Sequence, residues 1–203
     1  MAHTMIKEGS VGIRGSTNAL LERNLHRMRV LIDRSFSEIR LEKDPAPERH
    51  PMFLIDAVEE VRITMAEEAR LKGVKLAVQV DHQLQANVDR NYLISALSNL
   101  VQNAIKFSNR GGTVCVRSSE GEKTVALEVE DRCGGLPQGK AEELFLPFTQ
   151  KNGDRTGLGL GLSISRRAVA LNEGLLAVRD MPGIGCVFSI SLPKIAETAP
   201  ATT

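Results

Sequence analysis

The sequence has no large excess of charge of one sign, no long apolar run and little cysteine. Its 203 residues carry a formal net charge of +1, from 26 Lys and Arg against 25 Asp and Glu. A near-neutral chain without a basic run argues against nucleic acid as the main partner. No apolar stretch approaches the roughly 20 residues that a membrane helix needs. We therefore expect no membrane segment in this sequence, although a longer parent protein could still carry one.

The three cysteines are Cys115, Cys133 and Cys186. Their spacing matches no metal-binding motif, and so few thiols suggest a reducing, cytoplasmic environment. Cys115 and Cys186 fall in strand-like runs and are expected to be core residues. With 42% hydrophobic residues, the chain has material for one well-packed core and an appendage.

A polar stripe follows one side of a predicted helix from Arg90 to Phe107. At about 100° per residue, Asn99, Asn103 and Lys106 fall close together on the helix surface. The opposite side is apolar and consists of Leu93, Leu97, Leu100, Val101, Ala104 and Ile105. One interpretation is an ordinary solvated face. Two amides and a cation also suit a metal ion and a phosphate, and the loops downstream favour this second interpretation.

The first of these loops joins an aspartate to paired glycines at the end of a predicted strand. The run Thr124–Glu130 alternates apolar and polar residues, and Asp131-Arg132-Cys133-Gly134-Gly135 follows it. A carboxylate there can accept a hydrogen bond from an exocyclic amine, while the glycines let a flat base approach. The alternative is a plain turn capped by Asp131.

The second loop has glycine at every other position, at Gly157, Gly159 and Gly161. It leads into a helix predicted over residues 163–171. Free backbone N–H groups at a helix N-terminus form a ready phosphate site. No strand leads directly into this loop, so it is not the dinucleotide-binding fingerprint.

Taken together and in this order, the motifs resemble the nucleotide-binding domain of sensor histidine kinases. These kinases belong to the GHKL superfamily with gyrase, the mismatch-repair ATPases and a heat-shock chaperone. The resemblance covers about Phe53 to Pro193. Its motifs in this sequence are Asn99–Ser108, Asp131–Leu136, Phe145–Phe148, Gly157–Leu162 and Gly183–Phe188. Cys133 stands where the family usually has the first glycine of Asp-x-Gly-x-Gly. We expect base binding to survive this change with an altered loop geometry.

The resemblance implies a role for each motif residue. Asp131 would hydrogen-bond the adenine amine of ATP. Asn103 would hold Mg2+, and Lys106 would contact a phosphate. Asn99 would support the metal or phosphate end, so that Asn99 and Lys106 form the catalytic pair. The remaining nucleotide contacts would come from Gly135, Gly157, Gly159, Gly161 and Leu162.

The stretch from Arg132 to Thr156 would be a mobile lid over the nucleotide. Its cations Lys151 and Arg155 could reach the terminal phosphate. They could equally be solvated loop charges.

Asn99 also distinguishes two kinds of ATP chemistry. A fast ATPase such as gyrase has Glu one helical turn before the metal-binding Asn, as a base for water. The neutral amide of Asn99 cannot accept that proton. The site would therefore bind ATP with Mg2+ and wait for another nucleophile. In histidine kinases this nucleophile is a histidine on a separate helical dimerisation domain. The resemblance thus implies a homodimeric parent that passes its phosphate to a response-regulator receiver domain.

The expected acceptor histidine is not found. In the family, Glu or Asp usually follows it, whereas His3, His26, His50 and His82 are followed by Thr, Arg, Pro and Gln. His26 is the strongest alternative, because it lies on a predicted helix.

That helix covers about residues 18–41, with a coiled-coil seam at spacings of four and three. Ser16 or Thr17 can cap its start, and the Asp-Pro-Ala-Pro run at 44–47 ends it. The stretch resembles the second helix of the dimerisation domain. We therefore expect His26 to be a flanking residue.

The expected organisation has four segments: a loop remnant or tag (1–15), the second dimerisation helix (16–43), an ATP-binding catalytic domain (50–194) and a disordered tail (195–203). In the catalytic domain, periodicity predicts helices over 55–72, 90–107 and 163–171, and strands over 74–80, 85–89, 113–117, 124–130, 175–179 and 187–192. These elements predict an α+β fold, a two-layer sandwich with a mixed sheet covered by helices.

Two rival functions stay open. A serine/threonine kinase of the anti-sigma type shares the nucleotide fold but needs no acceptor histidine, and the predicted coiled-coil helix argues against it. A phosphotransfer or scaffold protein could carry a decayed ATP site. The presence of Asn103, Asp131 and the glycines at 157–161 argues against that.

Overall fold

The computed structural model describes residues 46–136, 141–147 and 159–195. All of them belong to the second of two units of the chain, Asp44–Thr203. Their elements, in order, are β1 (His50–Phe53), α3 (Leu54–Lys72), β2 (Lys75–Gln79), β3 (Gln85–Val88), α4 (Arg90–Phe107), β4 (Thr113–Glu120), β5 (Thr124–Glu130), the 3-10 helix η1 (Ala141–Phe145), α5 (Gly161–Leu171), β6 (Leu175–Met181) and β7 (Gly185–Pro193).

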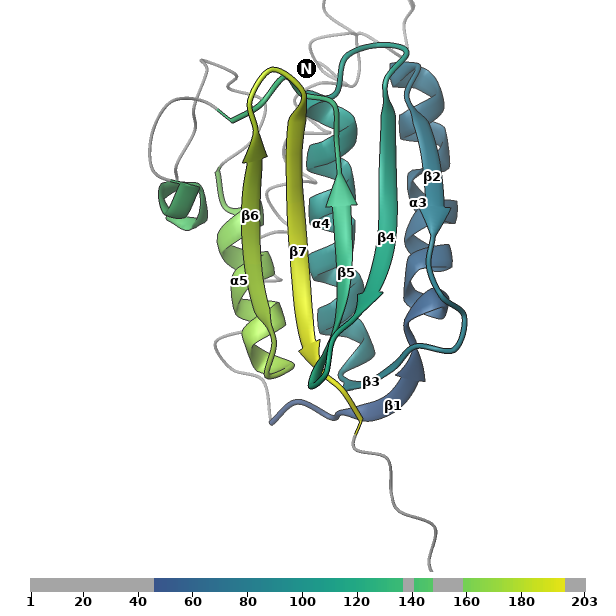
Figure 1. Ribbon diagram of the computed structural model, residues 1–203, viewed down its shortest axis with the longest axis vertical. Coiled ribbons are helices and arrows are strands. Elements are labelled where there is room, and N and C mark those ends of the chain that lie inside the picture. Colours follow the sequence, from purple (N-terminus) through teal and green to yellow (C-terminus); the bar gives the residue numbers. More distant parts are fainter. Residues whose placement is uncertain (1–45, 137–140, 148–158, 196–203) are drawn as a thin grey trace, which may run out of the picture. The chain divides into compact units, whose positions relative to one another are not determined.

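Five strands form one mixed sheet in the order β2-β4-β5-β7-β6. Strands β2 and β4 are parallel, and every other neighbouring pair is antiparallel. Helix α4 lies in the connection between β2 and β4, as a parallel pair requires. The helices α3, α4 and α5 cover one face of the sheet (Figure 1). The predicted two-layer sandwich with a mixed sheet is therefore confirmed.

The core lies between the sheet and these helices. Alternate residues of β5, Val125, Leu127 and Val129, are buried, while the residues between them are half-buried. This is the period-2 pattern of a strand with one covered face. The apolar side of α4 is also buried, and Leu93 and Leu97 are completely inaccessible. The packing leaves the polar side of α4 away from the core.

The structure differs from the predictions in several places. The 3-10 helix η1 was not predicted, and β4 runs to Glu120, three residues beyond its expected end. Strand β1 was not predicted; it pairs antiparallel with β3 in a separate two-stranded sheet. Its four residues include Pro51 and show no alternation, so the sequence carried no clear strand pattern. Helix α5 begins at Gly161, two residues before the expected start. Cys115 is half-buried on β4 and is not a core residue.

Three predicted segments lie outside the described residues: the loop remnant or tag at 1–15, the dimerisation helix at 16–43 and the tail after Ile195. In the part of the chain that the structure describes, no helix has the length and apolar character to cross a membrane.

Candidate functional site

The start of α4 is fixed by a network that also holds the end of α5. The Asp89 carboxylate caps α4 by accepting from the N–H groups of Asn91 and Tyr92. The N–H of Asp89 donates to Asn172 Oδ1 over 2.7 Å, and Asn172 Nδ2 donates back to the Asp89 carbonyl over 3.2 Å. Asn172 is buried directly after α5. This double contact holds the two helices against each other.

The N-terminus of α5 faces the amides of the polar stripe. A Cβ built on Gly161 would lie 3.6 Å from Asn99 Oδ1 and 4.0 Å from Asn103 Nδ2. The buried Ser165 hydroxyl donates to the Gly161 carbonyl over 2.9 Å and lies 3.5 Å from the carbonyl of Ala96. The fold thus brings together the stripe and the second glycine loop, which the sequence separates by about sixty residues.

Among the described residues, no side chain caps the first turn of α5. Leu160 occupies the N-cap position, and its side chain offers no acceptor for the first N–H groups of the helix. Gly159 precedes it with a φ of +71°, a conformation that favours glycine. A helix start without a cap, facing two amides, is suited to an anion.

Lys106 continues the stripe one turn after Asn103. Its Nζ lies 5.0 Å from the ring centroid of Phe107, within the range of a cation–π contact. Leu162, the other predicted contact in this region, is half-buried in the first turn of α5. Lys151, Arg155 and Gly157 lie outside the described residues.

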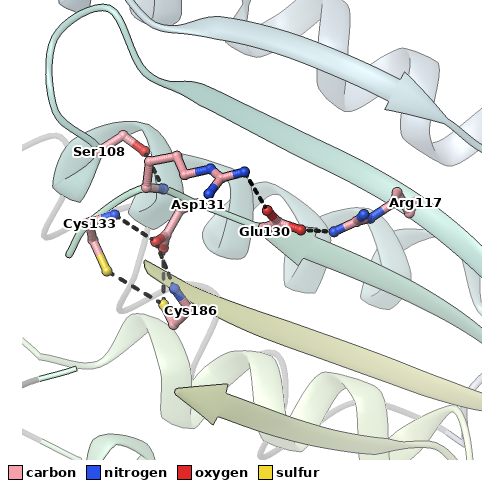
Figure 2. Close-up of polar contacts among 7 residues, drawn as sticks. Ser108, Arg117, Glu130, Asp131, Cys133 and Cys186 are labelled. Carbon is pink, nitrogen blue, oxygen red and sulfur yellow. Dashed lines mark hydrogen bonds and ion pairs between the residues drawn. The ribbon is translucent and has the colours of Figure 1, made fainter. Parts of the chain in front are cut away.

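Asp131 is buried at the end of β5, with only 2% of its surface exposed. Its Oδ1 accepts from the N–H groups of Cys133 and Cys186, over 3.0 and 3.1 Å. Its Oδ2 accepts from the Cys186 thiol over 3.1 Å. Figure 2 shows these contacts converging on one carboxylate. Because a carboxylate oxygen has two lone-pair sites, Oδ2 can accept one more donor.

The loop after Asp131 is held by the β6–β7 hairpin. Gly134 donates to the carbonyl of Ile184 over 3.2 Å and accepts from Gly183 over 2.9 Å. Gly134 and Gly135 have φ values of +91° and +107°, so both positions favour glycine. Cys133 does not have a positive φ. The family's usual glycine is therefore not needed there for backbone conformation.

Gly185 is required by a close approach. A Cβ on Gly185 would lie 2.0 Å from the carbonyl oxygen of Asp131 and 3.0 Å from its Oδ1. No side chain can occupy this space. The start of β7 therefore packs directly against Asp131, the residue predicted to bind the base.

Two cysteines lie beside that carboxylate. The sulfur atoms of Cys133 and Cys186 are 3.8 Å apart. Burial, and then the adjacent Asp131 carboxylate, raise the pKa of both thiols above the ordinary value of 9.0. Both are therefore protonated at neutral pH. Sequence reasoning missed this pair, because 53 positions separate the two residues.

The charges next to Asp131 belong to a separate ion-pair group. Glu130 pairs with Arg117 across the β4–β5 ladder and with Arg132, whose guanidinium is 3.3 Å away (Figure 2). The backbone of Arg132 is held by Ser108, whose hydroxyl accepts from the Arg132 N–H over 3.3 Å. Among the described residues, no cationic side chain pairs with Asp131.

The predicted motif around Phe145 packs on α5. Phe145 is buried at the end of η1, and the guanidinium of Arg166 lies 5.2 Å from its ring centroid. The same guanidinium pairs with Glu142 over 3.0 Å. Phe148, the last residue of that motif, lies outside the described residues.

Comparison with known proteins gives a consistent result. Residues 88–196 match the family described as histidine kinase-, DNA gyrase B-, and HSP90-like ATPase. The chain is 32% identical to an uncharacterised sensor-like histidine kinase of Rhizobium meliloti over 154 residues, 73% of this chain and 29% of that protein. It is also 32% identical to the sensor histidine kinase YclK of Bacillus subtilis, over 71% of this chain and 31% of YclK. The chain thus spans about a third of these relatives.

Solved structures show the same likeness. The catalytic domain of histidine kinase ThkA superposes with a TM-score of 0.66 at 27% identity, covering 72% of this chain and 96% of that domain. ThkA in complex with the response regulator TrrA gives a TM-score of 0.76 at 22% identity, covering 98% of this chain and 57% of that one. At that identity the second match speaks for the fold alone.

Proposed function

The chain belongs to the family of histidine kinase-, DNA gyrase B- and HSP90-like ATPases, and from this membership we propose that it transfers the γ-phosphate of Mg2+-bound ATP to a histidine. It corresponds to the ATP-binding catalytic portion of sensor histidine kinases. The observation that carries the proposal is the approach of the Asn99 and Asn103 amides to the uncapped start of α5. The amide oxygens there could bind a cation, and the free N–H groups of the helix start could bind the phosphates that this cation holds.

Asp131 is the proposed base-binding residue. Its Oδ1 is occupied by two backbone donors, which fix the carboxylate plane. Its Oδ2 would accept from the adenine amine beside the Cys186 thiol. Gly135 would contact the base through its backbone. Its φ of +107° and the close approach of the β6–β7 hairpin, where a Cβ would lie 3.2 Å from Asp180 Oδ1 and from Pro182 Cα, keep this position for glycine.

The residues of the stripe fit Mg2+ by their chemistry. Amide oxygens are hard ligands of the kind that this ion accepts, and the space that a Cβ on Gly161 would fill lies against them. Asn103 would hold the ion, and Asn99 would orient the phosphate end. When bound, Mg2+ neutralises charge on the phosphate oxygens. Lys106 would add a point charge, and the N–H groups of Gly161 and Leu162 would donate to phosphate.

Gly157, Gly159, Lys151 and Arg155 complete the proposed phosphate contacts. Of these four, the structure describes only Gly159. The family resemblance and the chemistry of these residues support their assignment: glycines expose backbone donors, and the two cations can approach a phosphate.

Asn99 keeps the hydrolysis of ATP slow. Its neutral amide cannot take a proton from water, so the bound γ-phosphate would await the imidazole of an acceptor histidine. None of the four histidines has the acidic neighbour usual for that role. We therefore assign the acceptor to a dimerisation helix of the homodimeric parent, which would relay the phosphate to a response-regulator receiver domain. ThkA, whose catalytic domain is 27% identical to this chain, forms a complex with the response regulator TrrA, which supports this partner. The three free cysteines support a cytoplasmic location.

A phosphotransfer assay tests the proposal. The chain is incubated with γ-labelled ATP, Mg2+ and a separate helix pair that carries an acceptor histidine. We expect acid-labile label on the helix pair, none with Asn103→Ala, and ATP hydrolysis below about 1 per second, the low end of enzyme turnover. Faster hydrolysis would contradict the role of Asn99. Acid-stable label on serine or threonine would instead identify an anti-sigma-type kinase.

A further inference from the structure

Cys133, Cys186 and Asp131 form a compact cluster, here called the thiol–carboxylate cluster. One ligand atom from each residue lies within 4.8 Å of the others. Asp131 has a proposed role in binding adenine, but that role uses neither sulfur as a ligand. We propose that this cluster binds a soft divalent cation of the Zn2+ type, and that the bound cation excludes adenine.

The spacing of the cluster suits tetrahedral coordination. With metal–sulfur bonds of about 2.3 Å, two sulfur ligands of a tetrahedral Zn2+ lie about 3.8 Å apart. The sulfur atoms of Cys133 and Cys186 are 3.8 Å apart before any metal is bound. A sulfur and a carboxylate oxygen on the same ion should be separated by about 3.5 Å. Cys186 Sγ and Asp131 Oδ2 are 3.1 Å apart, so they need to separate only slightly.

The charge and the donor atoms also favour such an ion. Asp131 is 2% exposed, and among the described residues its hydrogen-bond donors are two backbone N–H groups and a thiol, all neutral. Buried charges in proteins are usually paired or bound to metal. Two sulfur ligands favour Zn2+ over Mg2+, which prefers oxygen. Cys133 is half-buried, so the cluster is accessible from solvent.

The binding step balances without a redox partner. Each thiol releases its proton to solvent, two sulfur–metal bonds and one oxygen–metal bond form, and a fourth coordination position stays open to water. The two backbone N–H groups on Oδ1 would hold the carboxylate in place and leave Oδ2 for the metal.

Competition with ATP follows from the identity of the oxygen. Oδ2 is the atom that would accept from the adenine amine. A divalent cation on that oxygen would draw on its electron density and repel the amine hydrogen, so the cation and the base would compete. The competition rests on the proposed ATP-binding function, whereas the affinity for the metal does not. A rise in available Zn2+ would thus reduce ATP binding through the base pocket, away from the Asn103 metal position.

The metal site is tested by titrating the reduced chain with Co2+ and then displacing it with Zn2+. Sulfur-to-cobalt charge-transfer absorption reports thiolate ligands. Cys133→Ser and Cys186→Ser should each weaken Co2+ binding by more than about tenfold. Loss of a residue that only hydrogen-bonds a metal ligand already costs about that much in affinity. Cys186→Ser keeps a hydroxyl that can donate to Asp131. Cys115→Ser is the matched control, because Cys115 lies outside the cluster.

The competition is tested by calorimetry with ATP at free Zn2+ concentrations fixed by a metal buffer. Zn2+ should raise the apparent Kd for ATP in the wild-type chain and leave it unchanged in Cys133→Ser. A folded wild-type chain without the charge-transfer band, or an equal loss in Cys115→Ser, would overturn the metal site. Metal binding without any effect on ATP affinity would overturn the exclusion of adenine. If the metal-free chain does not bind ATP, the proposed function is contradicted. The metal site is then still tested by the Co2+ titration, which does not depend on ATP.

Discussion

Replacing Asp131 with asparagine separates base recognition from folding. In the wild-type chain, Oδ1 accepts from two backbone N–H groups, and an asparagine oxygen can keep both. The amide nitrogen then takes the place of Oδ2, the proposed acceptor for the adenine amine. Two donors would face each other there. The loss of one buried hydrogen bond costs about 1–3 kcal/mol, which corresponds to a roughly 5- to 150-fold rise in Kd for ATP.

The same substitution should shift the choice of base. Guanine presents an oxygen acceptor where adenine presents its amine donor. The asparagine amide can donate to that oxygen, so the affinity for GTP relative to ATP should rise. The free energy of unfolding should change by only about 1 kcal/mol, because the main contacts of the side chain persist.

Calorimetry with both nucleotides and urea titration of each variant measure these effects. Asp81→Asn is a suitable control, because Asp81 Oδ1 also accepts from the N–H two residues ahead, over 2.8 Å, but on an exposed turn. An unchanged ATP affinity in a folded Asp131→Asn chain would refute the reasoning and reduce Asp131 to a turn residue.

Three further predictions concern glycine packing, pH dependence and histidine labelling. Gly185→Ala places a Cβ 2.0 Å from the Asp131 carbonyl oxygen and should lower the free energy of unfolding by about 3 kcal/mol or more. Gly161→Ala meets only ordinary contacts, so this variant should fold normally but bind ATP more weakly. Thermal unfolding measures the first effect and calorimetry the second. Because the folded-state pKa of Cys186 is raised, folded protein retains a proton that the unfolded chain releases, so the free energy of unfolding should fall as pH rises above the ordinary thiol value of 9.0. Urea titrations at neutral and alkaline pH should show a smaller fall in Cys186→Ser. No histidine of the chain should be labelled by γ-labelled ATP, and acid-labile label that disappears in His26→Ala would make His26 the acceptor.

Much of the fold could be predicted because the elements carry clear periodicity. The bounds of α4 and β5 are those expected from the sequence. The apolar stripe of α4 and the strict alternation of β5 each correspond to one face that is covered in the fold. Strand β1 was missed because its pairing with β3 comes from tertiary structure. The N-terminus of α5 was placed too late, because Gly161 reads as loop yet belongs to the first helical turn.

For the candidate site, the sequence predicts local motifs but not their juxtaposition. The stripe on α4 and the glycines before α5 could each be identified, and the approach of Gly161 to Asn99 depends on helix packing. The thiol–carboxylate cluster had no sequence pattern at all. It forms because β7 pairs with β5, which brings Cys186 beside Asp131.

The most direct test of the central claim is calorimetric titration of the whole chain with a non-hydrolysable ATP analogue, with and without Mg2+. The account predicts saturable one-to-one binding that Mg2+ strengthens, and loss of the Mg2+ effect in Asn103→Ala. A chain that is folded by circular dichroism but binds no adenine nucleotide under either condition would contradict it.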